Sequence, residues 1–438
     1  MQKDKYLIIL AGATASGKTS LSIQLAKSLQ TVILSADSRQ FYREMNIGTA
    51  KPTPSEQSSV KHYFVDSHSI HQALSLGAYE REALLLLEKL YQERDCLIMV
   101  GGSGMYIKAI CEGLNEFPDV PQSIRQEVEK RWKKAGIEAL QEELAQKDPE
   151  YYAKVDLQNP HRLIRALSVI RYSGQRFSTF HQRPIKERPF KIIRICLQLN
   201  REVLYQRINQ RVHSMVKQGL VDEVKSLFKY RHLQALQTVG YQELFDHLEG
   251  KTNLQEAIEL IQRNTRRYAK RQLTWFRKSP NWFYTNPQQY EALLQYLQSV
   301  MTQKLKIRKA VAKDWSKLQG FYRSQLIDLT EQKAAVWLII EQNERIQAAI
   351  QLTTIKKMKV LSRFMALANL AEKSQRLLWQ QAIHRSENQP LFAIVDNEQA
   401  HLIRSLNFHP LPLLEAPKQV RDLFRSTTDA SLFELHQA

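Results

Sequence analysis

Cysteine is scarce in this sequence, and its placement argues against structural zinc. The three cysteines, Cys96, Cys111 and Cys196, lie far apart in a chain of 438 residues, and none belongs to a Cys-x-x-Cys pair. This spacing excludes a structural zinc site and favours reduced, buried thiols. We therefore expect a protein of the cytoplasm.

Long apolar runs are also missing. The densest spans residues 83–87 and is bounded by Glu82 and Glu88, whereas a membrane-spanning helix needs about 18 or more apolar residues. The apolar stretch near the N-terminus runs directly into a glycine-rich turn, which argues against a signal peptide. With 43% hydrophobic residues, the composition is typical of a soluble chain of two or three domains with no membrane partner.

Acidic residues are absent from one strongly basic stretch. The chain carries a formal charge of +19, and residues 263–278 concentrate bases without a single acid: Arg263, Arg266, Arg267, Lys270, Arg271, Arg277 and Lys278. A basic surface of this kind most often binds nucleic acid. The alternative is a solvated helix face, although such faces usually alternate acids with bases.

A glycine-rich turn stands near the start of the chain, between an apolar run and a helical pattern. It reads Gly12, Ala13, Thr14, Ala15, Ser16, Gly17, Lys18 and Thr19, which fits the phosphate-loop pattern. Residues 6–11 are typical of a buried strand, and the apolar residues after Thr19 have helical spacing. Such an arrangement aims backbone N–H groups and a helix N-terminus at a phosphate. We expect a phosphate or diphosphate site here, the alternative being a chance glycine turn.

Two further expected strands end in polar residues. Residues 31–35 lead to Asp37, and residues 95–100 lead to a second glycine turn that carries Ser103. Because ligands gather beyond the carboxyl ends of parallel strands, we expect these side chains on the same rim as the phosphate loop. Asp37 could act as a general base, could hold Mg²⁺ through water near Thr19, or could simply cap the next turn.

Two arginines and a tryptophan allow both functional and structural interpretations. Arg207 and Arg211 are four residues apart on an expected helix and share a face. Together they suit a diphosphate, although exposed arginines are common in any protein. Trp275, beside the basic stretch, could stack on an unpaired base or anchor its helix to the core.

Together these pieces resemble the tRNA dimethylallyltransferases, also called isopentenyl-tRNA transferases. The matching segments follow the family's order over roughly residues 5–285: residues 12–19, 37–42, 46–52, 101–106, 162–167, 240–243 and 265–277. The segments at 37–42 and 265–277 are more particular to the family than the phosphate loop. No zinc finger follows, so the chain is similar to bacterial members.

The resemblance implies a fold and a reaction. Residues 1–302 would form an α/β core with a parallel sheet like that of phosphate-loop NTPases, with a helical tRNA-binding insertion at about 115–185. The enzyme would move a dimethylallyl group from dimethylallyl diphosphate to N6 of adenosine 37, beside the tRNA anticodon, and release diphosphate. Because the target base is normally stacked, it would have to be flipped out. We expect a monomer.

The resemblance also implies roles for individual residues. The loop residues 12–19 with Arg207 or Arg211 would hold the diphosphate, with Mg²⁺ on Thr19, and Asp37 would accept a hydrogen bond or proton from the adenine amine. Lys18, Thr19 and Ser103 would complete the catalytic set. The positions matching tRNA contacts or lying on the expected tRNA surface are Asp37, Ser38, Arg39, Gln40, Ser103, Arg125, His161, Arg162, Leu163, Ile164, Arg165, Gly240, Tyr241, Arg266, Arg267 and Arg271.

Residues 303–438 extend past the usual end of the family. Segments at 307–314, 335–341, 345–353 and 397–408 are similar to acetyltransferases of the GNAT type, which implies a smaller α+β domain. That fold holds coenzyme A with a glycine-containing turn, but the corresponding residues 361–375 contain no glycine. Because backbone without glycine approaches a pyrophosphate poorly, we interpret the domain as a degenerate one that helps binding or assembly, rather than an active acetyltransferase.

Two other functions would account for part of the sequence. A phosphate-loop nucleoside or small-molecule kinase would use the loop but leave the basic stretch at 263–278 without a purpose. A nucleic-acid-binding ATPase would use both, but it would not explain residues 37–40 or the second glycine turn.

Overall fold

The computed structural model describes most of the chain, and statements below apply to those residues. They are 4–115, 117–181, 186–278, 282–303, 305–323, 335–342, 345–355, 358–366, 372–385, 391–396, 399–404, 406, 408–410, 416–417, 420 and 430–435.

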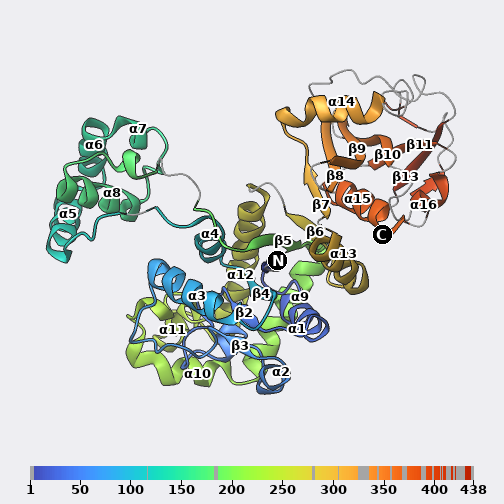
Figure 1. Cartoon of the computed structure of the whole chain (residues 1–438). Helices are drawn as coiled ribbons and strands as arrows, with labels where there is room; N and C mark the ends of the chain where they lie inside the picture. Colours follow the sequence, from blue (N-terminus) through green and yellow to red (C-terminus); the bar gives the residue numbers. More distant parts are fainter. Residues whose placement is uncertain are drawn as a thin grey trace. The chain divides into compact units, whose positions relative to one another are not determined.

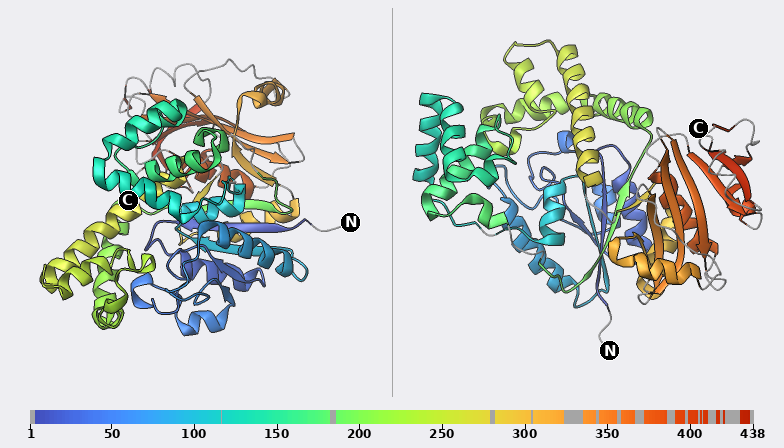
Figure 2. Two further views of the ribbon diagram at one scale, coloured as in Figure 1. Left: turned by 90° about the vertical axis from the view of Figure 1, so that its left-hand side faces the viewer. Right: turned by 90° about the horizontal axis from the view of Figure 1, so that it is seen from above.

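The N-terminal part is built on a six-stranded parallel sheet (Figure 1). Its strands are β1 (Tyr6–Gly12), β2 (Ile33–Ser35), β3 (His62–Tyr63), β4 (Cys96–Gly101), β5 (Lys191–Leu197) and β6 (Phe283–Thr285), in the order β3-β2-β4-β1-β5-β6. Every residue of β1 is buried, as is typical of a central parallel strand covered on both faces. Helices lie on both sides of the sheet (Figure 2).

Helices, including short 3₁₀ helices, connect or follow the strands of this sheet. They are α1 (Lys18–Ser28), η1 (Ile47–Thr49), α2 (Pro54–Ser59), α3 (Leu76–Leu90), α4 (Gly104–Glu112), α9 (Arg201–Lys217), α10 (Leu220–Leu227), η3 (Phe228–Tyr230), η4 (Gln234–Leu236), α11 (Gln242–Leu248), α12 (Leu254–Lys278) and α13 (Tyr290–Gln303). Alternate residues of β1, among them Ile8 and Leu10, pack with Leu25 of α1 and Leu297 of α13 in one hydrophobic cluster. This packing fixes the loop between β1 and α1 at the edge of the sheet.

A second compact unit comprises Leu76–Leu84 and Lys108–Pro189. Its remaining helices are α5 (Gln122–Ala135), α6 (Glu138–Lys147), α7 (Pro149–Tyr152), α8 (Pro160–Ser173) and η2 (Phe177–His181), and it has a hydrophobic core of its own. Buried Asp148 fixes two turns here, since its carboxylate accepts hydrogen bonds from the N–H groups of Tyr151 (3.0 Å) and Ser178 (2.7 Å). The boundary expected at 115–185 falls inside this unit and stays a prediction.

The C-terminal region has a separate, mixed sheet. Its elements are β7 (Leu305–Lys309), η5 (Ala312–Asp314), α14 (Trp315–Arg323), β8 (Ala335–Gln342), β9 (Arg345–Ile355), β10 (Met358–Ala366), α15 (Glu372–His384), β11 (Leu391–Asp396), α16 (Ala400–Arg404), β12 (Phe408–Pro410) and β13 (Ala430–Leu435). The strand order is β12-β13-β11-β10-β9-β8-β7, with β10 and β11 parallel and the other described pairs antiparallel. The expected α/β core with a parallel sheet, followed by a smaller α+β region, is confirmed, whereas the likeness of that region to the GNAT type stays a prediction.

Several local expectations are refined by the structure. Strand β2 begins at Ile33 rather than residue 31, because Thr31 N–H closes the end of α1 on the carbonyl of Ala26 (2.9 Å). Cys111 and Cys196 are buried as expected, whereas Cys96 is half-buried; all three are free thiols. None of the described helices combines the length and apolar character needed to cross a membrane.

Candidate active site

The phosphate loop has the backbone geometry of an anion site. Gly12 and Gly17 adopt positive φ angles of 154° and 89°, and Ala15 also lies in the left-handed region at 62°. Gly17 is the N-cap of α1, and no side chain makes a capping hydrogen bond there. The first N–H groups of a helix lack intrahelical partners, and the helix dipole favours a negative charge there. The loop therefore offers an anion both backbone donors and a positive helix end.

Two polar side chains of this loop fit an anionic ligand. The hydroxyl of Ser16 is buried and has no hydrogen-bond partner within the described part of the chain. The ammonium group of Lys18 donates a hydrogen bond to the carbonyl of Ala13 (2.7 Å). Burial lowers the pKa of Lys18 to about 8, against the opposing influence of the Asp37 carboxylate. A bound diphosphate would give both groups a charged partner.

A cavity of about 740 Å³ opens beside this loop. It is lined by the loop residues from Ala15 to Ser20, and by Arg207 and Arg211 from α9. The two arginines are one helical turn apart, and both reach the same cavity. Burial lowers the pKa of Arg211, while Asp37 opposes that effect. The structure thus brings together the cations that the sequence placed around a diphosphate.

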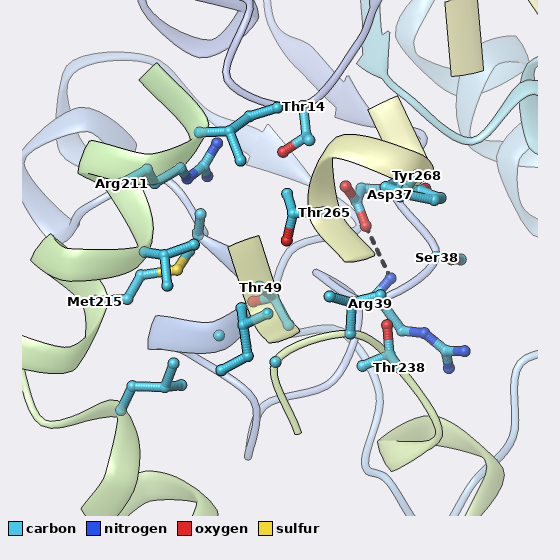
Figure 3. A pocket seen from close by; sticks show the side chains of 18 residues that line it. Thr14, Asp37, Ser38, Arg39, Thr49, Arg211, Met215, Thr238, Thr265 and Tyr268 are labelled. Carbon is cyan, nitrogen blue, oxygen red and sulfur yellow. Dashed lines mark hydrogen bonds between the residues drawn. The ribbon is translucent and has the colours of Figure 1, made fainter. Parts of the chain in front are cut away.

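A second, smaller cavity of about 210 Å³ contains Asp37 (Figure 3). Thr14 of the phosphate loop, Arg211 and Tyr268 line it as well. Asp37 Oδ1 accepts a hydrogen bond from the N–H of Arg39 (3.0 Å), so the carboxylate does cap the following turn. It also lines the cavity, so capping the turn does not remove Asp37 from the site, and its catalytic role stays a prediction.

The second glycine turn joins the Asp37 segment to helix α12. Ser103 Oγ accepts a hydrogen bond from the N–H of Ser38 (3.2 Å), and the hydroxyls of Ser103 and Tyr268 are also hydrogen-bonded. Burial raises the pKa of Tyr268 to about 12, and the neighbouring Asp37 carboxylate adds to this. A side chain at Gly101 would clash with the Ala36 carbonyl, since its Cβ would lie 2.4 Å from that oxygen.

Gln272 is a positioning residue that the sequence did not single out. Its Oε1 accepts a hydrogen bond from the N–H of Thr14 (2.9 Å), and its Nε2 donates one to the carbonyl of Gly102 (3.0 Å). One buried side chain thus connects both glycine turns. The sequence does contain a signal for this position. Gln272 is an uncharged polar residue in a basic stretch, and it lies four residues before the buried Phe276, so both share the buried face of the helix.

Glu223 was also missed, and it holds another wall of the site. Its carboxylate accepts hydrogen bonds from the N–H groups of Asn46, Ile47 and Gly48 (2.7–3.0 Å) and from the hydroxyl of Tyr241 (2.6 Å). Glu223 lies on α10, far in the sequence from residues 46–48. No local sequence pattern therefore predicts this contact.

The expected tRNA-contacting residues near this site differ in how exposed they are. Arg39 donates to the carbonyls of Gln234 and Gln237 (3.1 and 3.3 Å), and Gln40 donates to those of Thr49 and Ala50 (3.4 and 3.2 Å). Both residues are therefore also structural. Gly240 and Tyr241 are buried, so the Tyr241 side chain supports the fold instead of facing a partner.

Helix α12 carries the basic stretch on an exposed face. Arg267 and Arg271 are exposed, whereas Arg266 is half-buried and donates to Asn209 Oδ1 (2.7 Å). Phe276 is the buried anchor of this helix, and Trp275 is 37% exposed. The exposed tryptophan leaves an aromatic surface beside the bases.

Within the second unit, one side of α8 is polar and the other forms the core. Arg125, His161, Arg162 and Arg165 are exposed, while Leu163 and Ile164 are buried. Those two side chains pack inside the unit and do not face a partner. Arg165 lies over the ring of Phe117 (4.9 Å to its centre), and both line a cavity of about 370 Å³ with Arg125 and His161.

A metal site made only of protein ligands is not found among the described residues, since no three His, Cys, Asp or Glu side chains cluster to hold an ion. Thr19 nevertheless lines the phosphate-loop cavity. Mg²⁺ is commonly bound by one or two protein oxygens together with substrate phosphates. The residues present therefore fit an Mg²⁺ that arrives with a diphosphate and is held by Thr19.

Comparison with known proteins decides the family. The model described as IPP transferase matches residues 40–279, more than half of the chain. This chain belongs to the IPP transferase family. It is 50% identical over 280 residues to the tRNA dimethylallyltransferase of Christiangramia forsetii, an alignment that covers 64% of this chain and 93% of the relative.

Solved structures of the IPP transferase family agree with this assignment. The tRNA isopentenylpyrophosphate transferase of Bacillus halodurans is 35% identical, with 69% of this chain and 98% of that chain covered and a TM-score of 0.52. A eukaryotic dimethylallyltransferase acting on tRNA is 22% identical, covers 75% and 82%, and has a TM-score of 0.57, which supports the shared fold. The resemblance noted in the sequence is confirmed.

Proposed function

We propose that this IPP transferase moves a dimethylallyl group from dimethylallyl diphosphate to N6 of adenosine 37 in tRNA. The observation that carries the proposal is the pairing of two cavities. One holds the phosphate loop and the other holds Asp37, and Ala50, Arg211 and Met215 line both. A leaving diphosphate and an attacking amine would therefore meet where the cavities adjoin.

The phosphate loop would stabilise the leaving group. In the reaction the allylic C1–O bond breaks, the C1–N6 bond forms, and diphosphate departs with the electron pair. The backbone N–H groups of the loop, Lys18 and Arg211, which line the larger cavity, would meet the charge that develops. Mg²⁺ held by Thr19 would neutralise part of the same charge when it is bound.

Asp37 would serve the nucleophile. The adenine amine must lose a proton after it attacks, and a carboxylate lining the smaller cavity can accept its hydrogen bond or that proton. Ser103 would position the Asp37 segment through its hydrogen bond with the N–H of Ser38.

The exposed bases of α12 would bind the tRNA backbone, as would Arg125, His161, Arg162 and Arg165 of the second unit. Trp275 and the Arg165–Phe117 pair offer planar surfaces on which an unpaired base can stack. We further propose that the enzyme acts as a monomer in the cytoplasm, with dimethylallyl diphosphate and tRNA as its partners.

Residues 303–438 remain assigned by proposal to a degenerate GNAT-like domain that helps binding or assembly, following a core at 1–302. Part of the glycine-free stretch 361–375, namely 367–371, lies outside the described residues. Calorimetry with acetyl coenzyme A tests this assignment. We expect no measurable heat of binding, and saturable binding would make the domain a coenzyme A site.

The test of the main proposal is incubation with unmodified tRNA, dimethylallyl diphosphate and Mg²⁺, followed by mass analysis of the nucleosides. We expect N6-dimethylallyl-adenosine, and its formation should require both substrates. Hydrolysis of ATP or transfer of phosphate without any such product would instead favour an ATPase or a kinase.

A further inference from the structure

The smaller cavity has a polar side and an apolar end. Asp37 and Tyr268 lie on one side, and Met215 lies across from them on α9, with Thr265 between (Figure 3). The larger apolar side chains of the lining are those of Ile208, Val212, Met215, Leu220, Val239 and Ile261. The proposed reaction has one apolar component, the prenyl chain, and this end of the cavity is where an apolar chain can be buried.

Helix α9 relates this apolar end to the phosphate site. Arg211 and Met215 are four residues apart, so they lie one above the other on the same face. Both line the phosphate-loop cavity and the smaller cavity. One turn of helix advances about 5.4 Å, comparable to the length of an extended five-carbon chain. With the diphosphate at Arg211, the end of a five-carbon chain would therefore reach Met215.

Around Met215 the apolar side of the cavity is closely packed. Val212, Leu220 and Ile261 are each at most 2% exposed and belong to one hydrophobic cluster, against which Met215 packs. A chain with a second five-carbon unit would have to displace these side chains, and interiors packed at near-crystalline density resist such insertion. Met215 is half-buried, whereas Val212, Leu220 and Ile261 are buried, so its flexible thioether can be shortened with less disturbance of the core.

We infer that Met215 sets the length of the prenyl chain, as a specificity-determining residue that admits five carbons and rejects ten. This inference rests on the proposed function. With geranyl diphosphate the bonds are the same as before: C1–O breaks, C1–N6 forms, diphosphate keeps the electron pair and N6 loses a proton. The two substrates differ only in the second five-carbon unit, which geranyl diphosphate carries beyond its fourth carbon.

The experiment compares dimethylallyl diphosphate with geranyl diphosphate in the full-length protein. The variants are Met215→Ala, Met215→Leu, which keeps the volume, and Met45→Ala. Met45 is fully buried in the same cluster but lines neither cavity, so its truncation loosens the cluster without shortening the wall. Two quantities are measured: kcat/KM for transfer to tRNA, and the Kd of each diphosphate by calorimetry without tRNA.

We expect Met215→Ala to raise kcat/KM for geranyl diphosphate, relative to dimethylallyl diphosphate, by about tenfold or more, as one extra or missing methylene changes selectivity by 10–200-fold. The Kd for geranyl diphosphate should fall in parallel. Met215→Leu and Met45→Ala should keep the wild-type preference. If Met215→Ala is too unstable to assay, Met215→Val shortens the same wall and should shift selectivity in the same direction.

Two results would overturn the inference. One is a folded Met215→Ala or Met215→Val protein that transfers dimethylallyl but still rejects geranyl diphosphate. The other is an equal loss of selectivity in Met45→Ala, which would mean that general loosening is the cause. Failure of the proposed function looks different, because the wild-type protein would then neither bind nor transfer the dimethylallyl group.

Discussion

The two cavities along α9 differ in how many groups share each task. The phosphate side has backbone N–H groups, a helix N-terminus, Lys18, Arg207 and Arg211 around one expected anion. The other side places one carboxylate, Asp37, in its lining. The comparison teaches that, in the proposed mechanism, anion binding is distributed over many donors, whereas acceptance of the amine proton falls to a single side chain. Substitutions on the two sides should therefore differ in size.

The largest effect is expected at Asp37. Asp37→Ala should lower kcat for prenyl transfer by roughly 10²–10⁴-fold, the usual contribution of a general base, with little change in tRNA affinity. Asp37→Asn is the matched control, because its amide oxygen can still accept the hydrogen bond from Arg39 N–H. Single-turnover kinetics measures the rate of prenyl transfer, and filter binding measures the tRNA affinity. Near-normal turnover in the Asn variant would remove the carboxylate from its assigned role.

The next effect is expected at Lys18. Lys18→Ala should weaken use of dimethylallyl diphosphate by about 10²-fold, toward the lower limit for losing one preorganised charge donor, because other cations remain. Steady-state kinetics with varied diphosphate and fixed, saturating tRNA measures this. An unchanged kcat/KM for the diphosphate would refute the phosphate-loop assignment.

A smaller effect is expected from Gln272, which joins the two sides without contacting the reacting atoms. Gln272→Leu removes hydrogen bonds to Thr14 and Gly102, each worth about 1 kcal/mol, so we expect a loss of kcat of about thirtyfold at most. Gln272→Glu keeps one acceptor for Thr14 and should recover part of it. If Gln272→Leu lowers only the melting temperature, the residue stabilises the fold alone.

The smallest effect is a pH dependence of diphosphate affinity. Lys18 has a pKa of about 8 because of burial, so it is charged below that pH and neutral above it. A bound anion favours the charged form. Affinity should therefore be nearly constant below pH 8 and fall as the pH rises above it, by at most tenfold per pH unit. Calorimetry from pH 7 to 9.5 measures the change, and Lys18→Ala should lack this step.

Local features were predictable from the sequence because local backbone geometry produces them. The phosphate loop needs positive φ at Gly12 and Gly17, and only glycine adopts this conformation without strain. The apolar run of β1 and the position of Asp37 after β2 are equally local. The weakest predictions concerned side chains: Tyr241, Leu163 and Ile164 matched a motif, but packing buries them.

The sequence by itself determined the phosphate loop, the acidic and serine-bearing strand ends and the basic helix, since each depends on a few consecutive residues. Only the tertiary structure decided that Gln272 connects both glycine turns, that Glu223 holds residues 46–48, and that Met215 lines the same two cavities as Arg211. These contacts join segments up to 258 residues apart. No short pattern records them, because they arise when the helices pack against the sheet and place distant side chains in the same cavity.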